Sequence, residues 1–290
     1  MKIEEFLKKK RESLSPSSIK TYSSILRSLY KKVFGDDEID FDNFNKTDKI
    51  LEHLKDLPSN KRKTILSALV IATDNNKYRT LMLDDVKDYN NEIKKQEKTD
   101  TQKENWLEKD ELDSIYNSLK KQANSIYRKP KITNNDLQIL QNFILVALFK
   151  LIPPRRAKDY VDFKIKSVDT DTDNYMDKNK FIFNSYKTSK FYGKQIIDIP
   201  KELVTIINKW KKINPTEYLL FDSNLNKLTN VKLNQRFNKI FGKKASVNAL
   251  RHSFLTDKYA EDMKKKSAMS EDLKEMGSSL AQAETYIKID

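Results

Sequence analysis

The stretch Asn248-Ala249-Leu250-Arg251-His252-Ser253-Phe254 is followed by Met276-Gly277-Ser278-Ser279 and then by Tyr286. An arginine can neutralise a phosphate group, and a tyrosine hydroxyl can attack it as a nucleophile. An arginine beside a histidine, a Gly-Ser turn and a tyrosine can therefore break a phosphodiester bond without a metal ion. Such a reaction also needs further cations and a surface that holds a nucleic acid.

Composition is compatible with that chemistry. The chain has 290 residues, enough for two domains, and a net charge of +14. Residues 101–290 hold 35 Lys+Arg against 24 Asp+Glu, whereas residues 1–100 hold 21 against 18. Such an excess favours a polyanionic partner, although a Lys-rich protein from an AT-rich genome would show the same bias.

Several protein classes are excluded or disfavoured. The chain has no cysteine, which excludes disulfides, thiolate zinc sites and cysteine nucleophiles. His53 and His252 are the two histidines, which disfavours a histidine-built metal centre. The first residues lack the apolar core of a signal peptide, and no apolar run reaches membrane-spanning length. We expect an intracellular, soluble protein with no membrane partner.

The N-terminal part is predicted to be helical. Ser15-Pro16 is typical of a helix start, and apolar residues then recur at spacings of three and four up to Gly35. A second helix is predicted from Ser59. Its first turn carries Lys61, Arg62 and Lys63, which the helix dipole disfavours there, so we predict a phosphate contact. A solvated run of charges is the alternative.

The middle of the chain indicates a domain boundary and a change of fold. Residues 90–105 contain a single apolar residue, which predicts domains 1–92 and 106–290 joined by a linker at 93–105. The apolar run 143–149 predicts a buried helix. Strand-like segments predict a three-stranded antiparallel sheet at 162–165, 180–184 and 195–200. The predicted fold class is mainly α with a small antiparallel β-sheet (α+β).

Two basic motifs surround this predicted sheet. Pro153-Pro154-Arg155-Arg156 follows the buried helix, and because prolines end a helix, the arginines should emerge at its mouth. The lysine-rich segment 186–194 lies between the second and third predicted strands. A surface arginine pair and a solvated turn are the alternative interpretations of these motifs. For Tyr286 the alternative is an aromatic side chain that packs a terminal helix.

In order and spacing, these elements resemble the tyrosine recombinases (the phage-integrase family) over nearly the whole chain. The resemblance implies that Arg156, rather than Arg155, is the first catalytic arginine, because Asp159 lies three residues later and would brace it. It implies Arg251 as the second arginine and Tyr286 as the nucleophile. In the hairpin, Lys187 best matches the family's general acid, with Lys190 and Lys194 as competitors.

Two positions depart from the family pattern. Asn248 stands where the family has His or Lys, and asparagine cannot take up a proton at neutral pH. Ser278 stands where the family has His or Trp. His252 is expected to buttress the arginine or to replace the missing proton acceptor. Because the pKa of tyrosine is roughly 10, both arginines would be needed to stabilise phenolate-like charge on Tyr286.

The resemblance also implies partners and a mechanism. Residues 1–92 would be a DNA-clamping core-binding domain and residues 106–290 the catalytic domain, acting on double-stranded DNA through a 3′-phosphotyrosyl intermediate with no cofactor. Self-association into a tetramer on paired DNA sites and an origin in a mobile element or virus are expected. A type IB topoisomerase and a DNA-binding relative without catalysis are the alternatives. The residues expected to contact DNA are Lys61, Arg62, Lys63, Lys190, Lys243 and Lys244.

Overall fold

The computed structural model describes residues 1–35 and 38–288, without the side chain of residue 284. The chain divides into two compact units, Met1–Lys98 and Thr99–Asp290, and each is described by itself. This division falls inside the segment 93–105. A short helix, α6 (Asp100–Glu104), lies in the same segment and belongs to the second unit.

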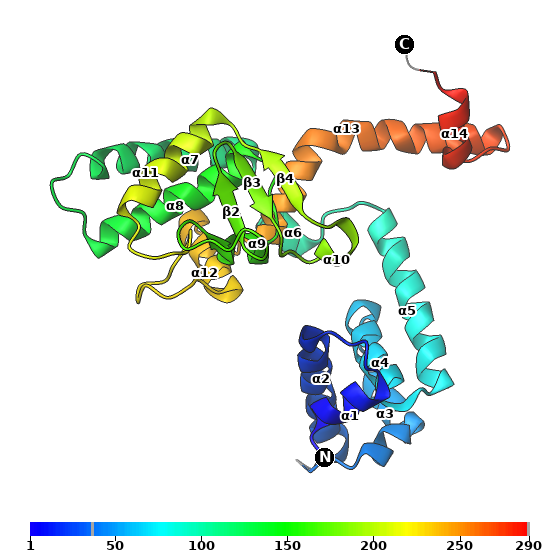
Figure 1. Cartoon of the computed structure of the whole chain (residues 1–290). Helices are drawn as coiled ribbons and strands as arrows, with labels where there is room; N and C mark the ends of the chain where they lie inside the picture. The colour runs from blue at the N-terminus through cyan, green and yellow to red at the C-terminus, as the bar shows by residue number, and fades with distance from the viewer. Residues whose placement is uncertain (36–37, 289–290) are drawn as a thin grey trace. The chain divides into compact units, whose positions relative to one another are not determined.

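The first unit is entirely helical in the part that the structure describes (Figure 1). Its elements are α1 (Ile3–Lys10), α2 (Pro16–Phe34), the 3-10 helix η1 (Phe41–Asn45), α3 (Thr47–Leu54), α4 (Ser59–Thr73) and α5 (Asn76–Lys94). The helix predicted from Ser15 to Gly35 is confirmed. The Ser15 Oγ accepts a hydrogen bond from the Ser18 backbone N–H at 3.1 Å, and Gly35 ends the helix in the left-handed conformation.

The second unit surrounds one buried helix, α8 (Asn134–Leu151), which contains the predicted apolar run. Helix α7 (Lys109–Ile126) packs against α8, and α11 (Lys201–Ile213) contacts it as well. Helix α8 ends at the residue before Ile152-Pro153, as the prolines require, because a residue before proline is disfavoured in helical conformation. The chain then turns into α9 (Ala157–Val161), and so the two arginines lie between a buried helix and a short one.

The small sheet is confirmed, with one strand and one pairing that differ from the prediction. It contains β1 (Phe163–Lys164), β2 (Asn174–Asp177), β3 (Lys180–Phe183) and β4 (Gln195–Asp198) in the order β1-β2-β3-β4. The β2–β3 and β3–β4 pairs are antiparallel, whereas β1 and β2 are parallel, so the sheet is mixed. Strand β2 escaped prediction because it begins and ends with polar residues and shows no apolar alternation.

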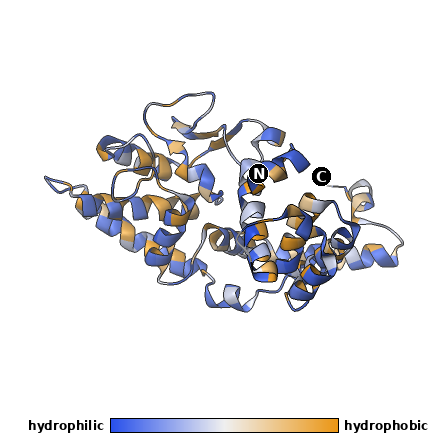
Figure 2. Ribbon diagram, turned by 90° about the horizontal axis from the view of Figure 1, so that it is seen from below, coloured by the Kyte–Doolittle hydropathy of each residue, from blue (hydrophilic) through white to orange (hydrophobic). Residues whose placement is uncertain are grey.

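The remaining helices of the second unit follow the sheet. They are α10 (Ser189–Tyr192), α12 (Asn230–Phe241), α13 (Val247–Glu275) and α14 (Leu280–Tyr286). In Figure 2, helices of both units carry hydrophobic and hydrophilic residues on different sides, as expected for helices that pack around a core. Within the described residues, no helix combines the length and the apolar character that crossing a membrane requires.

Candidate functional site

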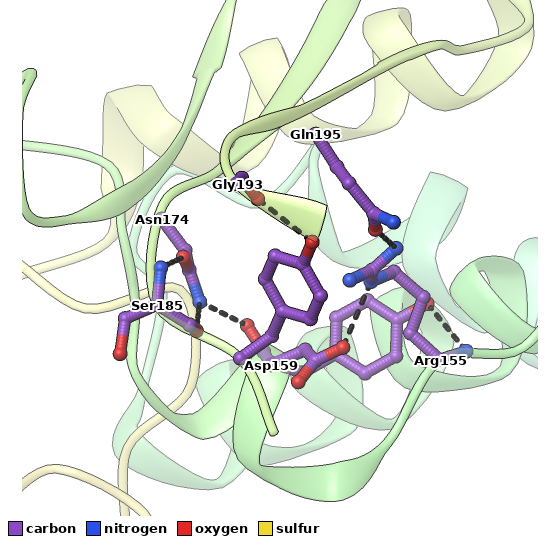
Figure 3. Close-up of polar contacts among 8 residues, drawn as sticks. Arg155, Asp159, Asn174, Ser185, Gly193 and Gln195 are labelled. Carbon is purple, nitrogen blue, oxygen red and sulfur yellow. Dashed lines mark hydrogen bonds and ion pairs between the residues drawn. The ribbon is translucent and has the colours of Figure 1, made fainter. Parts of the chain in front are cut away.

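The centre of the candidate site is Arg155, which is fixed from several sides. Its Nε donates a hydrogen bond to the Asp159 Oδ2 at 2.8 Å, and its Nη1 donates one to the Gln195 Oε1 at 2.9 Å (Figure 3). Its guanidinium carbon lies 3.8 Å from the ring centroid of Phe183 and 5.2 Å from that of Tyr186. With 14% of its side chain exposed, Arg155 joins α9, β3 and β4 as a structural anchor.

This ion pair corrects the prediction that Asp159 braces Arg156. The carboxylate pairs instead with Arg155, which lies directly before the N-cap of α9. Arg156 is the N-cap of that helix, and its backbone is extended. Burial raises the pKa of Asp159, and the positive charges of Arg155 and Arg156 oppose that rise. The two arginines therefore favour the charged form of a carboxylate whose charge burial disfavours.

The structure does bring Arg156 close to Arg251. Burial lowers the pKa of Arg251, the positive charge of Arg156 lowers it further, and Asp159 acts in the opposite direction. Guanidinium groups stay protonated at neutral pH, so the two side chains repel each other. Among the described residues, neither of these two side chains makes a hydrogen bond or an ion pair. Two half-buried, unpaired guanidiniums within electrostatic range of each other are a candidate site for an anion.

The hairpin that carries Lys187 is tied to the same centre. The Asn174 side chain donates hydrogen bonds to the Ser185 carbonyl at 2.8 Å and to the Asp159 carbonyl at 3.3 Å, and it accepts one from the Ser185 N–H. The Tyr186 hydroxyl donates to the Gly193 carbonyl at 2.7 Å, across the base of the hairpin (Figure 3). Lys187 follows Tyr186 directly, with its side chain exposed. The base of the hairpin is thus connected to α9.

Helix α13 begins with the motif around Arg251. Ser246 caps it, with its Oγ accepting from the Ala249 N–H at 3.1 Å. Val247, Leu250 and Ser253 are buried, which holds the first two turns against the core. Asn248 and His252 are exposed on the same turns. Both side chains are therefore accessible to solvent, and neither has a hydrogen-bonding partner among the described residues.

The predicted nucleophile is not placed at this centre. Helix α13 runs without a break from Val247 to Glu275, so the 24 residues after Arg251 extend for roughly 36 Å. Helix α14 follows at the far part of α13 (Figure 1) and is only about 10 Å long. Tyr286 ends α14 with 67% of its surface exposed. Tyr286, the last residue of α14, therefore lies near the far part of α13 and away from Arg251.

Ser278 is at the same distal end as Tyr286. It lies in the turn between α13 and α14, where Gly277 has a φ of 67°. Its Oγ is hydrogen-bonded to the Gln282 Oε1 at 3.1 Å, and its N–H donates to the Leu273 carbonyl at 2.7 Å. Ser278 thus stabilises the turn in this structure, far from the arginines.

Two of the cations predicted to contact DNA in the first unit have partners within the protein. Arg62 donates to both carboxylate oxygens of the buried Asp85 on α5, at 2.6 to 3.2 Å, and this pairing raises the pKa of Arg62. The Lys63 ammonium lies over the ring of Tyr89, and burial lowers the pKa of Lys63. Lys61 is exposed. Packing against α5 therefore explains two cations that the helix dipole alone disfavours.

Among the lysines of the second unit that were predicted to contact DNA, one has partners within the protein and two are exposed. The Lys243 ammonium donates to the Trp106 carbonyl and to the Glu111 Oε2, both at 2.6 Å, and so it links the loop before α13 to the start of α7. Lys190 and Lys244 are exposed. DNA contact by Lys61, Lys190 and Lys244 stays a prediction. Among the residues that the structure describes, no group of three or more His, Asp and Glu side chains is placed to hold a metal ion.

Four residues of the site were missed by sequence reasoning. Arg155, Asn174, Tyr186 and Gln195 join the proline turn to the hairpin. Arg155, Tyr186 and Gln195 lie in segments that the sequence singled out, whereas Asn174 lies in β2, which escaped prediction. Their contacts cross from one element to another. Because Arg155 lies before α9, its contact with Asp159 depends on the turn that follows Pro153 and Pro154 rather than on helical spacing.

No protein-family model matches the chain, and no curated protein sequence matches it significantly. The solved structures that are similar over most of its length include three of recombinases. The match to the XerA recombinase has a TM-score of 0.36 at 14% identity and covers 87% of this chain and 83% of that one. Matches to the XerH site-specific recombinase on difH before cleavage and on palindromic difH after cleavage have TM-scores of 0.41 and 0.42, at 14% and 15% identity. Each covers 89% of this chain and 84% of the other. The low identities and TM-scores of these matches do not assign a function to this chain.

Proposed function

We propose that this protein is a tyrosine-type site-specific DNA recombinase, which cleaves and rejoins duplex DNA through a 3′-phosphotyrosyl intermediate. The observation that carries the proposal is the pair of unpaired guanidiniums, Arg156 and Arg251, beside a third that is held by Asp159. Two arginines that repel each other in the free protein gain most from an anion between them. A phosphodiester offers two oxygens for such contacts.

The side chains supply each step of the reaction. The Tyr286 hydroxyl gives up its proton, for which His252 replaces the acceptor that Asn248 cannot be, and its oxygen attacks the phosphorus. The bond to the 5′-oxygen breaks, and a phosphotyrosyl bond forms to the 3′-side. The Lys187 ammonium gives its proton to the departing 5′-oxygen. Arg156 and Arg251 stabilise the negative charge on the pentacoordinate phosphorus. Rejoining is the reverse reaction, and it needs no external energy because the phosphotyrosyl bond retains that of the original ester.

The position of Tyr286 gives the proposal a further requirement. With Tyr286 at the end of α14, near the far part of α13 and away from Arg251, cleavage needs α14 to approach the arginines of its own chain or those of another copy. Self-association on paired DNA sites, ending in a tetramer, would satisfy this requirement. The turn at Ser278 and Ser279, with Gly277 in a left-handed conformation, is the point at which α14 can change direction.

The test is a nicked suicide substrate made from the DNA that flanks the gene. Cleavage at a phosphodiester beside the nick releases a short oligonucleotide, so the covalent adduct is trapped and appears as a shifted band on a denaturing gel. The expected adduct is lost in Tyr286→Phe and retained in Tyr259→Phe, a matched control on α13. An adduct that persists in Tyr286→Phe would identify another nucleophile.

A second candidate function is binding of DNA without cleavage. It is favoured by Asn248, which cannot accept a proton, and by the remote Tyr286 with its exposed hydroxyl-bearing ring. The same gel separates the two functions. A protein that binds the suicide substrate tightly, forms no adduct, and gains none after Asn248→His is a DNA-binding relative.

A further inference from the structure

Helix α10, at the tip of the β3–β4 hairpin, exposes two aromatic side chains. Phe191 is 85% exposed and Tyr192 is 71% exposed, and no large apolar side chain among the described residues is more exposed than Phe191. We call these two residues the aromatic tip. Nothing in the proposed chemistry at Arg156, Arg251 and Lys187 uses them. Covering large, water-exposed aromatic rings with a partner lowers the free energy of the complex.

The aromatic tip is held in place by local hydrogen bonds. The N–H groups of Phe191 and Tyr192 donate to the Thr188 carbonyl at 3.0 and 3.2 Å, and the Gly193 N–H donates to the Ser189 carbonyl at 2.8 Å. Gly193 has a φ of 63° and a ψ of −156°, a conformation that is essentially restricted to glycine. The turn therefore projects both rings outward as part of a defined structure.

Positive charge surrounds the aromatic tip. Lys187, Lys190 and Lys194 are exposed on the same hairpin, and the segment 185–197 contains no acidic residue. Rings beside lysines match a nucleic acid, in which bases stack on aromatic side chains while phosphates pair with the cations. A second copy of the same surface would bring three lysines against three lysines, which like-charge repulsion disfavours. A nucleic acid is thus the occupant that the charges and the rings favour, and the proposed function specifies duplex DNA.

The aromatic tip is also attached to the candidate phosphate site. Gln195, at the base of the hairpin, accepts a hydrogen bond from Arg155, and the Tyr186 ring lies 5.2 Å from the Arg155 guanidinium carbon. Figure 3 shows Gly193 and Gln195 in the same cluster as Arg155 and Asp159. A ring carried on this hairpin would meet the duplex within a few base pairs of a phosphate bound by the arginines.

We propose that Phe191, supported by Tyr192, is a wedge that inserts into the duplex and unstacks a base step near the scissile phosphate. The inference rests on the proposed function for its DNA partner. Apolar wedges of this kind kink DNA locally and let more protein surface contact it. Insertion of the wedge would cost less free energy at base steps that unstack easily. It would thereby favour pyrimidine–purine steps.

The test uses duplexes from the DNA that flanks the gene, with 2-aminopurine placed at successive base steps. Binding of the unaltered protein should raise the fluorescence at one or two adjacent steps, because an unstacked 2-aminopurine is brighter. Phe191→Ala should abolish that rise and weaken binding by roughly 5- to 100-fold, as loss of one stacked base does. Its salt dependence should not change, because no charge is lost. Phe191→Trp should keep both the rise and the affinity.

Lys190→Ala is the matched control on the same turn. It should flatten the log–log salt dependence by about one unit while leaving the fluorescence rise in place. If Phe191→Ala binds and fluoresces like the unaltered protein, the wedge is wrong although DNA binding stands. If the unaltered protein binds no duplex, the proposed function fails as well. If Phe191→Ala changes only the sedimentation of the protein without DNA, the aromatic tip is a self-association surface and the wedge is again wrong.

Discussion

The two halves of the candidate site are built in opposite ways. The arginine side, from Arg155 to Asp159 and across to Gln195, is half-buried and held by hydrogen bonds between separate elements. The tyrosine side, from the far part of α13 to Tyr286, is mostly exposed. The burial of Leu273 and Ala283, where α13 and α14 meet, holds that end together. The arginine side is thus preorganised, whereas the tyrosine side is the short helix α14 at the far end of the long helix α13.

This difference indicates how cleavage would be controlled. A preformed cation site can bind a phosphate at no cost in conformational order, which suits recognition of DNA. A nucleophile held at a distance cannot react until α14 is moved or another copy supplies it. Binding and cleavage should therefore respond to different substitutions, and the following predictions test that separation from the largest expected effect to the smallest.

The largest effect is expected at Tyr286. Tyr286→Phe removes the attacking oxygen alone, so formation of the covalent adduct should fall by at least about 10⁴-fold, as for other removed nucleophiles. Affinity for duplex DNA should stay within about twofold, because the ring is on the exposed tyrosine side. Adduct gels and fluorescence anisotropy on the same duplex measure the two quantities. A large loss of affinity would mean that Tyr286 also contributes to DNA binding, which would contradict the separation of binding from cleavage.

The next prediction concerns which copy supplies the tyrosine. If α14 serves another protomer, a mixture of Arg251→Ala and Tyr286→Phe should form the adduct although neither variant does so alone. The Arg251→Ala chain would be the labelled one, because it still carries Tyr286. If α14 returns to its own arginines, the mixture should be as inactive as its parts. Tagging one variant to change its size on the gel identifies the modified chain.

Substitution of Arg156 should affect the rate of cleavage, whereas substitution of Arg155 should affect the stability of the fold. Arg156→Ala should slow cleavage by about 10²- to 10³-fold, as loss of one transition-state donor does, with little change in stability because its side chain makes no ion pair among the described residues. Arg155→Ala leaves the buried Asp159 without its partner, which should lower the free energy of unfolding by about 3–5 kcal/mol. Thermal melting followed by circular dichroism separates the two. Equal melting temperatures would contradict the assignment of Arg155 as the anchor.

Sequence periodicity predicted the elements with strong patterns and missed those without them. The helices beginning at Pro16 and Ser59 and the buried segment of α8 follow from apolar spacing and capping residues. Strand β2 has no such pattern. Its place in the sheet depends on pairing with β1 and β3, and those contacts cannot be deduced from its own residues. Tertiary contacts decide the identity of a short strand.

The candidate site shows the same limit. The motifs around Arg156 and Arg251 were recognisable, but the partner of Asp159 depends on the turn that Pro153 and Pro154 impose. The remoteness of Tyr286 had a signal in the sequence, because no glycine or proline interrupts residues 247–276. That absence favours one long helix. Its consequence for the nucleophile becomes clear only when the length of α13 is compared with that of α14.

The smallest effect is expected in the first unit, where Arg62 and Lys61 repeat the contrast between a held and an available cation. Lys61→Ala should reduce the log–log salt slope of duplex binding by about one unit, because an exposed lysine that meets a phosphate releases one counterion. Arg62→Ala should leave that slope unchanged, since its guanidinium is occupied by Asp85, and should instead lower the melting temperature.

Anisotropy titrations at several salt concentrations measure the slope. Both variants are compared at temperatures where each is equally folded, so that unfolding does not affect the measured slope. A slope that changes in Arg62→Ala but not in Lys61→Ala would mean that DNA displaces Asp85 from its arginine, and the distinction between held and available cations would then fail in this unit.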